Sequence, residues 1–124
     1  MKRGEVTRML VADDEEDMRV LVRSVISRAN QGLVVESEAS NGIEAVERWR
    51  EFKPDVVILD QRMPGLTGLE AAEKILDEQP EQTIVLFSAF LNDVVRSAAA
   101  AIGIKVCVSK ENLFSLPETL WSFG

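Results

Sequence analysis

The chain has 124 residues, 46% of them hydrophobic, and its 14 Lys and Arg against 21 Asp and Glu leave a net charge of −7. This length and composition fit one domain spanning residues 1–124, with a core of about residues 8–122. The negative charge argues against direct binding of nucleic acid. No apolar run approaches the roughly 20 residues needed to span a bilayer. A single cysteine, Cys107, cannot form an internal disulfide, so we expect a cytoplasmic protein without membrane contact.

Short β-rich runs alternate with longer segments of helical period, which predicts βαβ units around a parallel sheet. The expected strands are, in chain order, residues 8–12, 33–39, 56–59, 83–87 and 104–108. A first helix ends at residues 30–32, and the later helices are expected at 43–52, 66–77, 92–102 and about 111–122. Every residue of 56–59 is apolar, as expected of a central strand covered on both faces.

The last predicted helix carries an apolar stripe, formed by Leu113, Leu116, Leu120 and Trp121. Pro117 lies in or near its early turns, which makes the start of this helix uncertain. These residues, together with Phe123 and the small side chains of the fourth helix, are expected to pack mostly in the core rather than at an interface. Some of them would remain available to a partner.

Acidic residues follow two of the predicted strands. Asp13 and Asp14 come after the run Leu10-Val11-Ala12, and Asp60 comes after Val56-Val57-Ile58-Leu59. Capping of the next helix would explain one carboxylate at a strand end, but two in succession favour a Mg²⁺ site, since this ion prefers oxygen ligands. Ligands of open parallel sheets bind at the carboxyl ends of strands, which is where these residues are expected.

Asp60 begins the turn Gln61-Arg62-Met63-Pro64-Gly65, which cannot continue a strand. Asp is common in turns, so the residue type alone does not decide its role. A carboxylate held clear of its own helix can act as a nucleophile, and attack on phosphorus beside two other carboxylates requires a divalent cation. We therefore interpret Asp60 as a nucleophile next to Asp13 and Asp14.

Two further polar residues end strands. Lys110 follows the run Val106-Cys107-Val108-Ser109, and Ser88 follows Leu86-Phe87. Solvation of the lysine and a turn or capping role for the serine are the simpler interpretations of each residue alone. In a phosphoryl site, however, the ammonium of Lys110 and the hydroxyl of Ser88 would both contact phosphoryl oxygens.

The set Asp13, Asp14, Asp60, Ser88 and Lys110 resembles the receiver domain of two-component response regulators. The resemblance covers about residues 8–121, and its most specific motifs are Leu10-Val11-Ala12-Asp13-Asp14 and Asp55 to Gly68. It implies an α/β, flavodoxin-like fold: a doubly wound five-stranded parallel sheet in the order 2-1-3-4-5, with five helices.

The resemblance also implies a mechanism. Asp60 would accept a phosphoryl group from a sensor histidine kinase, a phosphotransfer protein or acetyl phosphate. Mg²⁺ would be bound by Asp14, Asp60 and the backbone carbonyl of Arg62, with Asp13 acting largely through water. Ser88, followed by Ala89, and Lys110 would hold the phosphoryl oxygens. The domain would then be a signalling switch that catalyses only its own phosphorylation and dephosphorylation.

The same resemblance places the output on the face of the fourth helix, fifth strand and fifth helix. A second copy of the domain, in a homodimer, or an output domain beyond Gly124 would bind this face. Cys107 stands where the family usually has an aromatic switch residue, so aromatic rotation is in doubt, and Cys107 is expected to be a small buried hydrophobe. Glu111 replaces the proline that often follows the lysine.

Arg62 and Phe90 lie two positions beyond Asp60 and Ser88. Both would reach over the phosphoryl group and restrict the attacking water, which predicts slow self-hydrolysis. Three other functions remain open: a receiver-like interaction module without phosphorylation, a small Mg²⁺-dependent phosphohydrolase, and a flavodoxin-like cofactor carrier. The intact acidic residues disfavour the first, the short chain the second, and the acidic residues after the first strand the third.

Overall fold

The computed structural model describes residues 6–121, and its centre is a parallel five-stranded sheet in the order β2-β1-β3-β4-β5. The strands are β1 (Thr7–Ala12), β2 (Leu33–Ala39), β3 (Val56–Leu59), β4 (Thr83–Ser88) and β5 (Val106–Ser109). The helices are α1 (Glu16–Ala29), α2 (Gly42–Phe52), α3 (Gly68–Glu78), α4 (Asp93–Ile102), the 3₁₀ helix η1 (Lys110–Ser115) and α5 (Leu116–Trp121). The predicted sheet order and five α-helices are confirmed.

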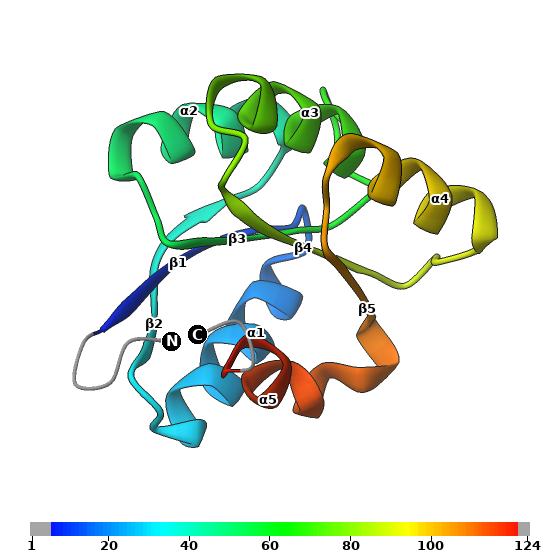
Figure 1. The fold of residues 1–124 in the computed structure, drawn as a ribbon. Helices are drawn as coiled ribbons and strands as arrows, with labels where there is room; N and C mark the ends of the chain where they lie inside the picture. Colours follow the sequence, from blue (N-terminus) through cyan, green and yellow to red (C-terminus); the bar gives the residue numbers. More distant parts are fainter. Residues whose placement is uncertain (1–5, 122–124) are drawn as a thin grey trace.

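Helices cover both faces of the sheet. Figure 1 shows α2, α3 and α4 above it, and α1 and α5 below it. One apolar cluster joins the sheet to the upper helices through residues such as Trp49 and Ile75, and a second joins it to the lower helices through Ile26 and Leu120. Because both faces are covered, the four residues of β3 are all buried, as their apolar sequence predicted.

The register of the strands brings their carboxyl ends to one edge. Ala12 is paired with Leu59, Leu59 with Leu86, and Ser88 with Ser109. The residue that follows each of β1, β3 and β5 therefore emerges at the same edge of the sheet. Asp13, Asp60, Ser88 and Lys110, which lie far apart in the sequence, are thus brought together at the carboxyl ends of the strands. We call this end of the sheet the polar edge.

The third helix begins two residues later than the pattern predicted. Thr67 is its N-cap, in extended conformation, and forms a capping box in which its hydroxyl accepts from the Glu70 amide and the Glu70 carboxylate accepts from the Thr67 amide. Leu66 therefore belongs to the loop, although apolar periodicity had placed it in the helix. The capping box, rather than the apolar pattern, decides this boundary.

The single helix expected over residues 111–122 was wrong. A 3₁₀ segment with a non-helical residue at Asn112 precedes α5. Pro117 is buried in the first turn of α5, where its missing amide hydrogen costs no helical hydrogen bond. The predicted core residues Leu113, Leu116 and Leu120 are confirmed as buried.

Other apolar side chains of the last two helices differ from that expectation. Trp121 is 47% exposed and Val94, on α4, is 78% exposed, whereas Phe123 lies outside the described residues. Within residues 6–121, no helix is long and apolar enough to cross a membrane.

Candidate functional site

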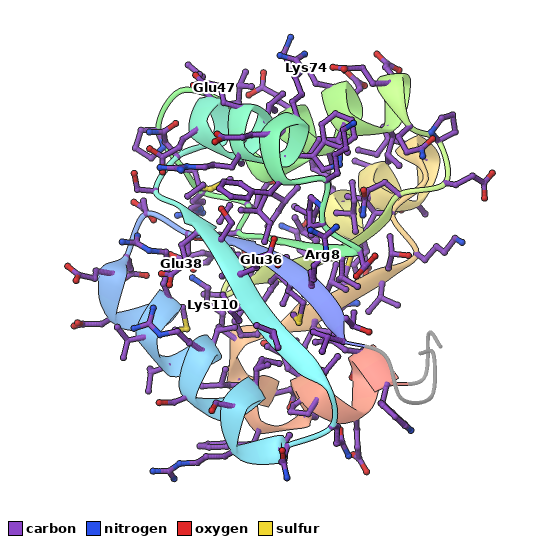
Figure 2. The ribbon with its side chains drawn as sticks, turned by 90° about the vertical axis from the view of Figure 1, so that its left-hand side faces the viewer. Arg8, Glu36, Glu38, Glu47, Lys74 and Lys110 are labelled. Atoms are coloured by element: carbon purple, nitrogen blue, oxygen red, sulfur yellow. The ribbon has the colours of Figure 1, made fainter. Side chains whose placement is uncertain are left out.

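Lys110 is the central cation of the polar edge. Its ammonium Nζ lies 2.8 Å from Oδ2 of Asp13 and 3.3 Å from Oδ2 of Asp60. All three side chains are at least nine-tenths buried, and Lys110 is one of the residues labelled in Figure 2. Burial by itself lowers the pKa of Lys110, but hydrogen bonding and attraction to Asp13 and Asp60 outweigh it, so the pKa is raised. Lys110 is therefore charged at neutral pH.

Asp60 has the position that the sequence predicted, directly after β3. Its backbone amide donates to the carbonyl of Ala12 at 2.9 Å, which continues the pairing of β3 with β1, and its Oδ1 accepts from the Gln61 amide. Burial raises the pKa of Asp60, repulsion from Asp13 raises it further, and Lys110 opposes both effects. The ionised form of Asp60 is thus destabilised by burial and by repulsion from Asp13, and an added cation would stabilise it.

Asp13 is buried, with 2% of its surface exposed, and every polar group of the residue has a partner. Its amide donates to the carbonyl of Ala39, its Oδ1 accepts from the Glu15 amide at 2.9 Å, and its Oδ2 accepts from Lys110. These contacts fix Asp13 at the end of β1, on the strand next to β3.

A compact acidic group lies beside Asp13. Carboxylate oxygens of Asp13, Asp14 and Glu15 all lie within 4.8 Å of one another, and Asp14 and Glu15 are exposed. One buried and two exposed carboxylates suit Mg²⁺, because this ion is bound by a few carboxylates and keeps several water ligands. The residues present therefore fit the ion that the sequence predicted.

Glu15 is the residue that sequence reasoning missed. It is the N-cap of α1, makes no side-chain capping bond, and places Oε1 3.8 Å from Lys110 Nζ. In the sequence, the one signal that Glu15 would lie near Lys110 is its position directly after Asp13 and Asp14.

The loop after Asp60 is held by glycines and by Gln61. The Gly68 amide donates to the Gln61 carbonyl and the Leu69 amide to Oε1 of Gln61, both at 2.9 Å. A Cβ on Gly68 would overlap the backbone carbonyl group of Asp60. Gly65 has φ +80°, a conformation that favours glycine. The turn that follows Asp60 is thus constrained both by the conformation of Gly65 and by the close approach of Gly68 to Asp60.

Ser88 is completely buried at the end of β4, and its Oγ accepts from the Phe90 amide at 3.2 Å. Ala89, between them, is exposed. The ring of Phe90 in turn lies under the guanidinium of Arg62, with Cζ 3.8 Å from the ring centroid. This cation–π contact joins the β3–α3 loop to the β4–α4 loop across the polar edge. The two residues predicted to reach over the phosphoryl group thus contact each other.

Cys107 lies within β5 and is partly buried. Burial raises the pKa of its thiol, and attraction to Arg96 opposes this only in part. The thiol is therefore protonated at neutral pH and acts as a small, weakly polar side chain, but Cys107 is only partly buried and not buried as predicted, because β5 is at the edge of the sheet.

The model of the response regulator receiver domain family matches residues 9–118. The chain belongs to this family. The match spans the polar edge from Asp13 to Lys110, and the sheet has the strand order that the family resemblance implied.

Relatives with established names support this assignment. Chemotaxis protein CheY of Thermotoga maritima is 36% identical over 103 residues, which cover 83% of this chain and 84% of that protein. Response regulator GacA of Pseudomonas viridiflava is 40% identical over 78 residues, 63% of this chain but 36% of the relative. The family therefore includes proteins of this size and longer regulators that contain such a domain.

Solved structures show the same architecture. The signal receiver domain of the putative response regulator NarL from Mycobacterium tuberculosis has a TM-score of 0.89 at 26% identity, covering 97% of both chains. The response regulator domain of Thermotoga maritima CheB has a TM-score of 0.84 at 28% identity, covering 95% of this chain and 92% of that one.

Proposed function

We propose that this receiver domain accepts a phosphoryl group on Asp60 and thereby switches the shape of a surface read by a partner. The observation that carries the proposal is the buried bridge of Lys110 to Asp13 and Asp60. A purely structural role would need one carboxylate to neutralise one ammonium. Here two buried carboxylates share it, so the centre has excess negative charge, and a divalent cation would balance this excess.

In the proposed reaction, a carboxylate oxygen of Asp60 attacks phosphorus in an in-line displacement. The new bond joins this oxygen to phosphorus, while the bond to a histidine nitrogen of the donor, or to the acyl oxygen of acetyl phosphate, breaks. The leaving group retains the electron pair. Mg²⁺, when bound, would neutralise the charge on the phosphoryl oxygens and the carboxylates. Asp14, Asp60 and the carbonyl of Arg62 would hold it, with Asp13 acting through water and Glu15 at the rim.

Two residues are suited to contact the phosphoryl oxygens of the product. Lys110 is a buried, charged ammonium already 3.3 Å from Asp60, so it would exchange part of its contact with the carboxylates for one with the phosphoryl group. The hydroxyl of Ser88 accepts from Phe90, which leaves its own proton free to donate to an acceptor. Both side chains would stabilise the added negative charge.

The surface formed by α4, β5 and α5 is the proposed output. Its helix α4 comes soon after Ser88 in the chain, and its strand β5 leads directly into Lys110. Val94 and Trp121, on its two helices, are exposed apolar side chains that a partner would cover. A second copy of the domain or an output domain are the proposed occupants, and a cytoplasmic histidine kinase or phosphotransfer protein is the proposed donor. With Cys107 in β5, we propose that coupling relies on Ser88 and not on rotation of a buried aromatic ring.

The test is the intact mass of the native chain and of Asp60→Asn after incubation with acetyl phosphate, with and without Mg²⁺. We expect one phosphoryl adduct that requires both Mg²⁺ and Asp60. An adduct on Asp60→Asn would place the acceptor elsewhere. Absence of any adduct, together with failure to bind beryllofluoride, would favour the alternative of an interaction module that works without phosphorylation.

A further inference from the structure

Arg19, on the first turn of α1, contacts the backbone of the acidic site. Its Nη1 donates to the carbonyl oxygen of Asp13 at 2.7 Å, and its Nε donates to Oε1 of Glu38 at 3.1 Å. The Arg19 side chain is 17% exposed. One guanidinium therefore joins the loop after β1 to the end of β2, and it does so without touching the carboxylate of Asp13.

The carbonyl that Arg19 holds belongs to the peptide unit between Asp13 and Asp14. This unit is planar, so fixing its oxygen also fixes the direction in which the chain leaves toward Asp14. The amide of Asp13 is held on the other side by the carbonyl of Ala39 on β2 at 3.0 Å. Two contacts to β2, one direct and one through Arg19 and Glu38, thus orient the link between the two acidic residues.

Glu38 keeps Arg19 in place. Its second oxygen pairs with Arg23, one turn further along α1, so that two arginines of the same helix share this carboxylate. Figure 2, in which β2 faces the viewer, labels Glu38 on that strand. Arg23 is 49% exposed, and among residues 6–121 its one recorded polar side-chain partner is Glu38. It supports the same ion pair without reaching the acidic site.

We propose that Arg19 is a positioning residue that sets the relative orientation of Asp13 and Asp14 for a divalent cation. This inference rests on the proposed function, because it assigns Arg19 a role toward the Mg²⁺ that the acidic residues would bind. Arg19 does not touch the ion site itself but holds the backbone that carries the expected ligands. Loss of such supporting hydrogen bonds weakens metal binding.

The sign of the effect separates this role from simple electrostatics. Removing a positive charge near an acidic site should strengthen binding of a cation, since the repulsion between them is lost. Removing a positioning contact should weaken it, because the carboxylates no longer converge. Arg19→Ala and Arg23→Ala remove the same charge from the same helix and the same partner, Glu38, but only Arg19 contacts Asp13. The pair is therefore a matched comparison.

The experiment is calorimetric titration of Mg²⁺ into the native chain, Arg19→Ala and Arg23→Ala without a phosphodonor. We expect the dissociation constant to rise about tenfold for Arg19→Ala and to change less than about twofold for Arg23→Ala. In the metal-free proteins, the amide NMR signal of Asp14 should shift in Arg19→Ala and stay near its native position in Arg23→Ala. Arg19→Lys, which keeps the charge but lacks a second donor direction, should bind with intermediate affinity.

Equal or tighter binding by Arg19→Ala, or an equal loss in both alanine variants, would overturn the role of Arg19 while native Mg²⁺ binding still supported the proposed function. Failure of the native chain to bind Mg²⁺ would overturn the proposed function and this inference with it. If Arg19→Ala does not fold, as judged by its circular dichroism, native affinity in folded Arg19→Lys together with an unshifted Asp14 amide would overturn the inference.

Discussion

Lys110 reaches Asp13 across the width of two strands: Nζ lies 2.8 Å from Oδ2, although β5 and β1 are separated in the sheet by β4 and β3. Asp60, at the end of β3, lies between them and shares the same ammonium. This relationship joins the ends of the first, third and fifth strands through charged, hydrogen-bonded side chains, at the edge where the proposed reaction takes place. It also makes the stability of the domain depend on the residues of its site.

Replacing Lys110 with methionine should destabilise the domain by about 3 kcal/mol in metal-free buffer, because it leaves two buried carboxylates facing each other without a counterion. The pKa of Lys110 is raised, so its stabilising charge is present at neutral and mildly alkaline pH and is lost as the pH rises through that raised pKa. Mg²⁺ should restore more stability to Lys110→Met than it adds to the native chain. Urea unfolding with and without Mg²⁺ measures both effects.

Lys105→Met is the matched control for this prediction. Lys105 is exposed, precedes β5 and has no recorded ion pair within residues 6–121, so its replacement should change the unfolding free energy by less than about 0.5 kcal/mol. An equal loss of stability in the two variants would show that the ion pairs of Lys110 with Asp13 and Asp60 do not stabilise the fold.

Asp60→Asn should increase the stability of the metal-free domain at neutral pH by on the order of 1 kcal/mol. Burial and repulsion from Asp13 raise the pKa of Asp60, so its ionised form costs the folded state more than the unfolded chain. The gain over the native chain should shrink as the pH falls through this raised pKa, where native Asp60 becomes protonated. Unfolding curves at a series of pH values test this; a gain that grew toward acidic pH would contradict it.

Gly68→Ala should destabilise the domain by about 2 kcal/mol and slow phosphorylation, because the added Cβ would meet the backbone of Asp60. The helix propensity of alanine acts in the opposite direction, favouring α3 by about 1 kcal/mol. The sign of the change therefore decides between the two effects. Thermal unfolding combined with the rate of adduct formation from acetyl phosphate is the measurement, and a stabilised variant with a native rate would exclude the steric role.

Arg62→Ala and Phe90→Ala should each shorten the lifetime of the phosphorylated domain by about two- to fivefold, the range expected from loss of an exposed cation–π contact. Either change would open the proposed cover over the phosphoryl group and admit the attacking water. The decay of the phosphoryl adduct by intact mass gives the lifetime. Phe114→Ala is the control, since Phe114 is 83% exposed on η1 and lies outside this contact; an unchanged lifetime in both site variants would refute the proposed cover.

Much of the site follows from local patterns. Short β-rich runs predicted the strands, and the polar residues that follow or end four of them were therefore expected at one edge of the sheet, as is found for Asp13, Asp60, Ser88 and Lys110. Boundaries that depend on capping were predicted less well. The start of α3 and the break at Asn112 are set by hydrogen bonds of particular side chains and by backbone geometry, which apolar periodicity does not detect.

The fold class, the family resemblance and the five polar residues at the strand ends could all be predicted from the sequence, because the apolar pattern and the end of each strand are local properties. Which polar groups meet depends on tertiary contacts that the sequence does not reveal: the sharing of Lys110 by Asp13 and Asp60, the approach of Glu15 to Lys110, the contact of Arg62 with Phe90, and the hydrogen bond from Arg19 to Asp13. Contacts of this kind join residues distant in the chain, and they depend on strand register and side-chain direction, which exist once the sheet has formed.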